Sequence, residues 1–184
     1  MGRLIERVGT KAGINVKQYH FTSGVLVKTK LVCSATPITL TDDAGVAQYG
    51  GVQLYNFPEG MLCTMGGVVD GALTGGVTGT IIDTYTGVVA LGTATATTGA
   101  TLTGTEADIL QSTALTQAVA KVAVCDAISI ATALTEAGSR WFDGSTTAKD
   151  LFLNFAIADD VSHTSGTAAF TGTVEFVWMI LGDK

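Results

Sequence analysis

Hydrophobic and polar residues alternate along much of the chain. In the segment FTSGVLVKTKLV, residues 21–32, apolar or β-branched side chains recur at every second position from residue 25 onward. A period of two is typical of a β-strand with one buried and one solvated face. We therefore predict a strand whose inner face carries Val25, Val27, Thr29 and Leu31 and whose outer face carries Leu26, Lys28, Lys30 and Val32.

Similar strand patterns recur further along the chain. They occupy residues 50–57, 61–73, 118–134, 151–157 and 170–184. The stretch at 118–134 is rich in alanine, so a helix is the alternative there, but its alternation favours a strand. The last stretch is apolar on both faces towards its end, which predicts a strand that is central in a sheet or packed against a partner.

Turn signals separate the predicted strands. Pro58 and Gly60 flank Glu59 in the motif FPEG, and a proline at the second position with a glycine at the fourth predicts a tight reversal. Residues 34–45 contain Pro37, which cannot donate to a strand ladder, and end in an Asp-Asp-Ala-Gly turn. We predict that they form a connection. Asp143-Gly144 in the motif WFDG is a further turn signal.

Two short helices are predicted. Thr105 followed three residues later by Asp108 resembles a capping box, and Glu106 suits the positive end of a helix dipole, so one or two helical turns are expected there. A single helical turn is predicted over residues 146–149. The Gly/Thr-rich tract 71–104 contains too many large apolar residues for a disordered linker and is predicted to form strands and wide turns.

Composition agrees with a β-protein. The chain has 184 residues, of which 29 are Thr and 23 are Gly, residue types that suit pleated strands and turns better than helices. With no βαβ rhythm, the pattern predicts an all-β, jelly-roll-like β-sandwich with one or two short helices and an extended N-terminal arm. We expect a basic arm at 1–20 and a single domain at 21–184.

Charge is unevenly distributed along the chain. Residues 1–30 carry six bases and one acid (net +5), 31–120 no base and seven acids (−7), and 121–184 four bases and eight acids (−4), which sum to −6. The basic arm is either a solvated terminus or a segment that binds an acidic protein surface. In the second case the partner-binding residues are Arg3, Arg7, Lys11 and Lys17.

Nucleic acid and membranes are not expected as partners. The basic residues lack interleaved aromatic residues, and a pI near 4.7 is unusual for a phosphate-binding protein. The longest apolar stretch, 118–134, is interrupted by Lys121 and Asp126, so no membrane span is predicted. The N-terminal residues also lack the apolar core of a secretory signal.

The sequence offers little catalytic or metal-binding chemistry. Its three cysteines, Cys33, Cys63 and Cys125, are far apart and form no CxxC pair, so neither a disulfide framework nor a zinc site is predicted. Its two histidines, His20 and His163, belong to no recognisable catalytic motif. We expect no cofactor, no metal and no enzymatic activity.

Two carboxylate arrangements remain open as alternatives. Asp159, Asp160 and His163 could bind a cation in one loop, although a solvated turn is the simpler interpretation. Glu59 with Asp70 or Asp83 could form the acid pair of a glycoside hydrolase, which makes a carbohydrate-binding or glycan-cleaving β-sandwich one alternative function.

Four segments together resemble a known family. They are LYNFPEG at 54–60, ALGTATATTGATLTGTEADILQST at 90–113, FDGSTTAKDLFLNFAIADD at 142–160 and GTVEFVWMILGDK at 172–184. They are similar to small virion proteins of tailed bacteriophages that decorate or cement the capsid. The resemblance implies a jelly roll or related sandwich, a homotrimer, and a location on the capsid exterior after assembly in the host cytoplasm. The first 20 residues depart from it.

The resemblance also implies a function and a partner. The expected function is a capsid decoration protein that binds the outer surface of the shell formed by the major capsid protein and stabilises it. A tail or head-fibre component is the alternative within the same class. A charged fraction of only 14% is well below the usual quarter and suits packing against other protein surfaces.

Overall fold

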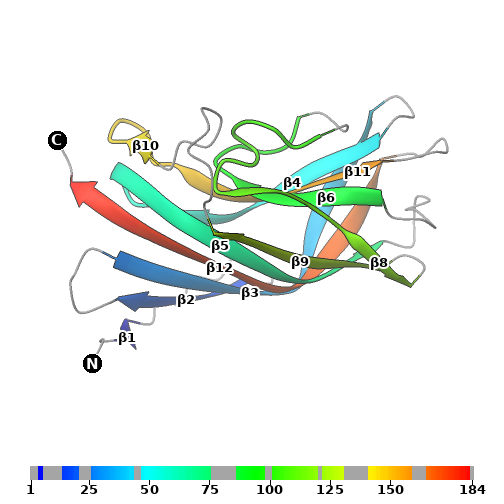
Figure 1. Ribbon diagram of the computed structural model, residues 1–184, viewed down its shortest axis with the longest axis horizontal. Helices are drawn as coiled ribbons and strands as arrows, with labels where there is room; N and C mark the ends of the chain where they lie inside the picture. Colours follow the sequence, from blue (N-terminus) through cyan, green and yellow to red (C-terminus); the bar gives the residue numbers. More distant parts are fainter. Residues whose placement is uncertain are drawn as a thin grey trace.

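The structure is a computed structural model, and its secondary structure confirms the predicted all-β class. It describes residues 4–5, 14–20, 26–43, 47–75, 86–97, 101–119, 122–130, 141–158 and 165–182. Within these residues every regular element is a strand (Figure 1). The strands are β1 (Leu4–Ile5), β2 (Ile14–His20), β3 (Leu26–Asp43), β4 (Ala47–Asn56), β5 (Gly60–Gly75), β6 (Thr86–Gly92), β7 (Leu110–Ala114), β8 (Thr116–Val119), β9 (Val122–Ile130), β10 (Trp141–Gly144), β11 (Asp150–Ala158) and β12 (Gly166–Gly182).

The strands form two antiparallel sheets that share strand β3. Sheet A has the order β2-β3-β12-β5-β9-β8, with β1 added beside β2 and β10 beside the first residues of β5. Sheet B has the order β7-β6-β11-β4, and β4 pairs with the last three residues of β3. The long strands of sheet A run beneath those of sheet B in Figure 1.

The pairing order is that of a jelly roll. The hairpin β3–β4 lies between β12 and β11, these two lie between β5 and β6, and β9 and β7 are outermost. Strands that follow each other in the chain, such as β3 and β4 or β11 and β12, therefore lie in opposite sheets. This arrangement rolls a single antiparallel ribbon into a sandwich. The jelly-roll-like β-sandwich expected from the sequence is therefore observed.

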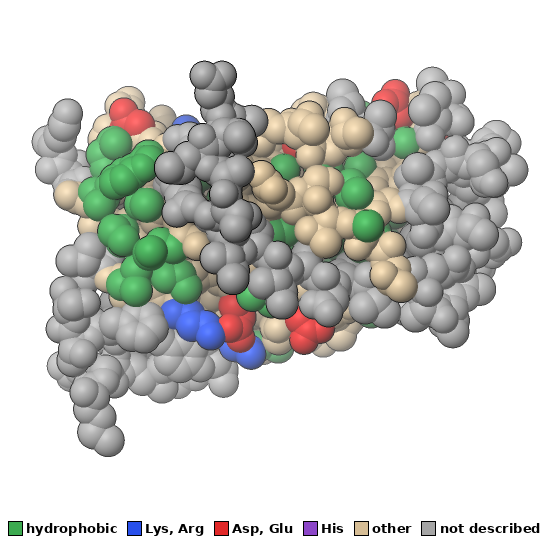
Figure 2. Space-filling view, in the orientation of Figure 1, with side chains coloured by type: hydrophobic (Ala, Val, Ile, Leu, Met, Phe, Trp, Pro, Cys, Tyr) green, Lys and Arg blue, Asp and Glu red, His purple; other side chains and the backbone are tan. Residues whose placement is uncertain are grey.

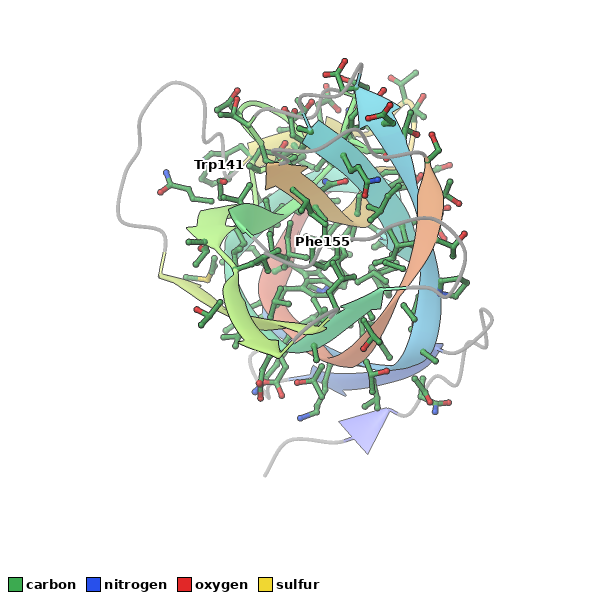
Figure 3. The ribbon with its side chains drawn as sticks, turned by 90° about the vertical axis from the view of Figure 1, so that its right-hand side faces the viewer. Trp141 and Phe155 are labelled. Carbon is green, nitrogen blue, oxygen red and sulfur yellow. The ribbon has the colours of Figure 1, made fainter. Side chains whose placement is uncertain are left out.

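Two of the passages between the sheets are nearly continuous strands. Strand β3 leaves its partner β12 after Leu40 and pairs with β4 from Thr41 onward. In the other passage Leu115, between β7 and β8, donates its N–H to the carbonyl of Gly87 at 2.8 Å. Strands that change sheets at corners curl the structure around its core, and Figure 3 shows Phe155 inside this curl.

The core lies between the two sheets and follows the alternation of the sequence. In β12 every second residue from Val174 to Trp178 is buried, and β11 adds Leu153 and Phe155 from sheet B. At one end four aromatic rings from both sheets pack with centroid distances of 5.4 to 6.2 Å, namely Tyr55, Phe57, Phe176 and Trp178. Edge-to-face packing of this kind adds stability beyond burial alone. It ties β4 to β12.

Most predicted strands are confirmed, including the alternation around residue 28. Val27, Thr29 and Leu31 are buried, whereas Lys28 and Lys30 lie on the other face. The C-terminal strand is central, since β12 lies between β3 and β5. The FPEG motif connects β4 to β5 with a bend at Glu59, and Gly60, at φ 127°, is the first residue of β5.

The predicted connection at residues 34–45 is wrong, because β3 continues through it to Asp43. The register with β12 shifts between Phe170 and Gly172, and Ala35 adopts φ 48° opposite this irregularity. Its N–H donates to Thr171 Oγ1 at 3.0 Å. A bulge therefore bends the strand without ending it. Among the described residues, β2 pairs with β3 only as far as Cys33, which precedes Pro37.

Both predicted helices are wrong, because the described residues contain no helix. Around Thr105 only one turn forms, closed by Ala107 N–H donating to the Gly104 carbonyl at 3.1 Å. Asp108 caps no helix and instead accepts hydrogen bonds from Thr93, 15 residues away. Residues 145–149 form bends between β10 and β11. Long-range hydrogen bonds outcompeted the local helical signal.

The predicted N-terminal arm contains two strands. Strand β2 pairs with β3 from Ile14 opposite Cys33 to His20 opposite Val27, and β1 pairs with β2. The described part of the arm is therefore an extension of sheet A.

Candidate interaction surface

The outer face of sheet B is covered by the chain itself. Residues 93–97 and 101–109, between β6 and β7, fold back over it and are held by the side chain of Asn154 in β11; we call these residues the covering segment. Asn154 Nδ2 donates to the carbonyls of Ala94 and Glu106, both at 2.9 Å, and its Oδ1 accepts from the N–H of Ala96 at 2.9 Å. Asn154 is fully buried. Its three side-chain hydrogen bonds all go to the covering segment.

Small side chains let the covering segment approach the sheet closely. A second cluster of buried residues lies between segment and sheet, formed by Ala90, Ala96, Leu102 and Ala156. A Cβ at Gly51 would collide with Asn154 Oδ1, and one at Gly92 with the Thr105 carbonyl. Alanine and glycine at these positions therefore give sheet B a thin second core on its outer side.

The ends of the covering segment are joined by Asp108. Its carboxylate accepts a hydrogen bond from the Thr93 N–H at 2.9 Å and another from Thr93 Oγ1 at 2.6 Å. Burial raises the pKa of Asp108 to about 6, although the hydrogen bonds from Thr93 lower it, and the nearby Glu106 carboxylate raises it slightly further.

Sheet A, in contrast, exposes large apolar side chains at one end; Trp141 points to its outer face, whereas Ile180 is opposite the buried Leu62 and lies at the margin of its inner face. Met65, Trp141, Ile180 and Leu181 are the exposed large hydrophobic residues of the described chain, with 38% to 53% of their surfaces accessible. They lie where β5 begins, β12 ends and β10 is added. Figure 2 shows hydrophobic side chains gathered at this end of the molecule. We call these four residues the apolar end.

Strand register explains why Trp141 is exposed. On β10, Phe142 is opposite Leu62 and is buried, so its neighbour Trp141, opposite Cys63, points to the outer face. Figure 3 places Trp141 at the periphery of the curled sheet and Phe155 in its interior. Apolar side chains gathered on a surface are characteristic of protein contact sites.

A row of charged residues crosses sheet A beside the apolar end. Lys28 and Lys30 on β3 both bind Glu175 on β12, with Nζ to carboxylate distances of 2.5 and 2.7 Å. Hydrogen bonds from these two lysines hold the pKa of Glu175 below its usual value. Figure 2 shows positive and negative side chains next to one another below the hydrophobic area.

Two like-charged pairs flank this row in the strand register. Lys17 on β2 is the direct cross-strand partner of Lys30. On the other side of the sheet Asp70 on β5, which is exposed, is the partner of Asp126 on β9. Positive charge is thus placed on β2 and β3, and negative charge on β12, β5 and β9.

Only some of the predicted binding and catalytic residues lie within the part of the chain that the structure describes. Lys17 lies in β2, whereas Arg3, Arg7 and Lys11 lie outside the described residues. The same is true of the cation-site candidates at 159–163 and of Asp83. For these residues the sequence-based expectations stay predictions.

One predicted carboxylate pair is excluded by the fold. Glu59 is exposed in the turn before β5, and Asp70 is exposed further along the same strand. At about 3.3 Å per residue the two are roughly 30 Å apart, whereas a glycosidase pair lies about 5 to 10 Å apart. Glu59 is the tip of a turn and no partner of Asp70.

Cys33 and Cys63 are buried free thiols, and burial raises the pKa of Cys33. Cys125 and His20 lie within strands β9 and β2. Among the residues that the structure describes, no group of three His, Cys, Asp or Glu could hold a metal ion. The same residues include no helix long and apolar enough to cross a membrane.

Sequence reasoning does not identify the apolar end. The sequence WFDG predicts a turn at Asp143 and Gly144, but the structure shows strand β10 there, paired with β5. The sequence signal that pointed to a contact surface was the C-terminal strand, which carries Ile180 and Leu181 and is apolar on both faces. Comparison of the chain with protein-family models, curated proteins and solved structures returned no match.

Proposed function

We propose that this chain is a virion structural protein of a tailed bacteriophage that decorates the outer surface of the capsid. The observation that carries the proposal is the apolar end of sheet A. Because the covering segment lies over the outer face of sheet B, large apolar side chains left exposed on sheet A favour contact with another protein surface.

The fold and the resemblance support the same proposal. Jelly rolls are the architecture of many viral capsid domains. Two of the four segments that resemble decoration proteins, 142–160 and 172–184, supply strands that border the apolar end, β10 and β12. The protein would act by buried area and by avidity, since weak contacts to a shell multiply when several copies are joined.

In this proposal the basic N-terminal residues contact the shell. Arg3, Arg7 and Lys11 precede β2 in the chain, and a chain with a net charge of −6 concentrates positive charge at this end. Complementary charge steers association and selects partners. The major capsid protein is the proposed partner, and the capsid exterior is the proposed location.

Co-sedimentation with empty shells tests the proposal. The shells are assembled from the major capsid protein encoded in the same genome, and the protein is added at increasing concentration. We expect saturable binding at a fixed ratio to the shell subunits. Protein that stays in the supernatant at every concentration would contradict the proposal, and binding of only a few copies to whole virions would favour a tail or head-fibre component.

The role of the basic residues is tested by substitution, because deletion of residues 1–20 would also remove β2 from sheet A. Arg3, Arg7 and Lys11 are changed to Ser together, and Lys17 is left in place. We expect shell binding to weaken at least about tenfold. Lys149→Ser, which removes a base elsewhere on the surface, is the matched control and should bind normally. Equal binding by both variants would exclude the basic residues as the contact.

A further inference from the structure

We infer that the outer face of sheet A binds a copper(I) ion through Cys63 and the methionines that surround it. The inference goes beyond the proposed function and does not depend on it, because it concerns a ligand of the free protein. It rests on the strand register around Cys63 and on the preference of soft metal ions for sulfur ligands.

The neighbours of Cys63 on this face are three methionines and a tryptophan. Along β5 the next side chains on the same face are those of Met61 and Met65, in the sequence Met-Leu-Cys-Thr-Met. Across the sheet, Met179 on β12 and Trp141 on β10 are the direct partners of Cys63. The chain has four methionines, so three of them lie beside this one cysteine.

A β-bulge keeps Met65 on the outer face. Thr64 is opposite Trp178, and both are buried. The next pair is Gly66 with Val177, so Met65 is an additional residue on β5. Its side chain is 45% exposed, whereas that of Thr64 is 1% exposed. Met65 therefore lies on the outer side of the strand.

The methionine side chains are long enough to reach an ion bound to Cys63. Direct cross-strand partners have Cβ atoms about 5 Å apart, and residues two apart on a strand are about 7 Å apart. Methionine is unbranched and has three rotatable bonds, so its sulfur adapts to its surroundings. Cys63 is 7% exposed, and Met61 and Met179 are half-buried. An ion held at this position therefore has limited contact with water.

The donor set selects the metal. Thiolate and thioether sulfur atoms suit copper(I). Zinc is bound by thiolate, imidazole and carboxylate ligands, and among the described residues no three groups of that kind could hold one ion. When copper(I) binds, the thiol of Cys63 releases its proton to solvent, because the thiolate is the metal ligand. The hydrogen bond that this thiol donates to the Thr64 carbonyl is long, at 3.8 Å, and is lost with the proton.

Titration with copper(I) under argon tests the inference. Bicinchoninate, a coloured copper(I) chelator, competes for the metal. We expect one copper(I) to bind per chain and to quench tryptophan fluorescence. Trp141→Phe should remove most of the quenching, because the other tryptophan, Trp178, is buried on the inner face. If no copper(I) leaves the chelator, the inference is overturned.

Leucine substitutions distinguish the methionine site from a single thiol. The variant Met61→Leu/Met65→Leu/Met179→Leu keeps apolar side chains of similar volume and leaves Cys63 in place. We expect copper(I) to bind at least about hundredfold more weakly, because loss of even an outer-shell partner of a metal ligand costs up to that much. Equal affinity of this variant and the wild type would overturn the inference, since a thiol alone would then account for the binding.

Two further variants guard against a change of fold. Met179→Leu makes a smaller perturbation and should weaken copper(I) binding about tenfold. Cys33→Ala removes the buried thiol of β3 and is the matched control, with the affinity of the wild type. Loss of binding in Cys33→Ala, with an unchanged circular dichroism spectrum, would place the metal elsewhere and contradict the inference. Copper(I) binding and shell binding are measured separately, so failure of one proposal leaves the other standing.

Discussion

The outer faces of the two sheets of this jelly roll differ in whether the chain covers them. Sheet B presents alanine and glycine to its outer side and holds the covering segment over them through Asn154. Sheet A presents large apolar side chains and charged residues and, at the apolar end, leaves Trp141 about half exposed. Small side chains allow a segment of backbone to approach, and a buried amide can satisfy that backbone. Sheet A has bulky apolar side chains at this end and no buried amide to hold a covering backbone there among the described residues. Such a surface favours contact with another protein.

This difference separates stability from association within one domain. The covered face contributes buried area and hydrogen bonds to the single chain, so its residues should matter for folding. The exposed face contributes little to the single chain, so its residues should matter for binding. Each prediction below tests one side of this distinction.

The largest effect is expected from Asn154→Ala in the covered face. The substitution leaves two carbonyls and one N–H without their partner in a buried site and opens a cavity. We expect the free energy of unfolding to fall by about 3 to 4 kcal/mol. Urea denaturation measures the change, and faster proteolysis within 93–109 would show that the cover has loosened.

Asn56→Ala is the matched control for this prediction. Asn56 also donates a side-chain hydrogen bond, to Asp150 Oδ1 at 2.6 Å, but both residues lie at the surface. Loss of that bond should cost less than about 1 kcal/mol. Equal costs for the two asparagines would contradict the role assigned to Asn154.

Two neighbouring aromatic residues on β10 test the exposed face. Phe142 is 7% exposed and Trp141 is 53% exposed, because successive side chains of a strand point to opposite sides. Phe142→Ala should lower the free energy of unfolding by about 3 kcal/mol. Trp141→Ala should lower it by less than about 1 kcal/mol but weaken binding to the shell. A large loss of stability with Trp141→Ala would show that this side chain serves the fold.

A smaller, pH-dependent effect is expected from Asp108→Asn. In the folded chain the pKa of Asp108 is raised to about 6 from an ordinary 3.8, so folding favours the protonated form. The corresponding stability is complete below pH 4 and is lost as pH rises through 6. Between pH 5 and pH 7.5 this loss should amount to about 1 to 2 kcal/mol.

Asparagine removes this titration and keeps an oxygen that can accept from the Thr93 N–H. Urea denaturation of the variant at the two pH values should therefore show a smaller decline in stability than the wild type shows. Asp143→Asn, at an exposed position, is the control and should retain the wild-type decline. A variant with an unchanged pH dependence would assign the decline to other groups.

Strand positions could be predicted from the sequence because alternation is a local property. The faces of β3 around Lys28, the strand over 151–157 and the apolar C-terminal strand all followed from a period of two. The FPEG turn followed from the backbone preferences of Pro58 and Gly60. The helix near Thr105 was mispredicted because Glu106 and Asp108 match the pattern of a helix start. In the structure Asp108 instead accepts hydrogen bonds from Thr93.

The candidate surface could be predicted only in part. The two-faced apolar pattern of the last strand indicated a central strand or a partner contact, and β12 is central. Trp141 lay in a motif that suggested a turn, and its exposure depends on pairing with Cys63, far away in the chain. The charges of sheet A are likewise spread over five strands.

The sequence by itself determined the fold class, the inner and outer positions of most strands and the interruption between strands at Glu59. These depend on the conformational preferences of each residue and on the period of hydrophobic side chains, which act over a few residues. Tertiary structure alone decided which strands are neighbours, which outer face the chain covers and which charges share one surface. Those features depend on hydrogen bonds between residues far apart in the chain, as between Asn154 and Ala94, and no local pattern encodes such distances.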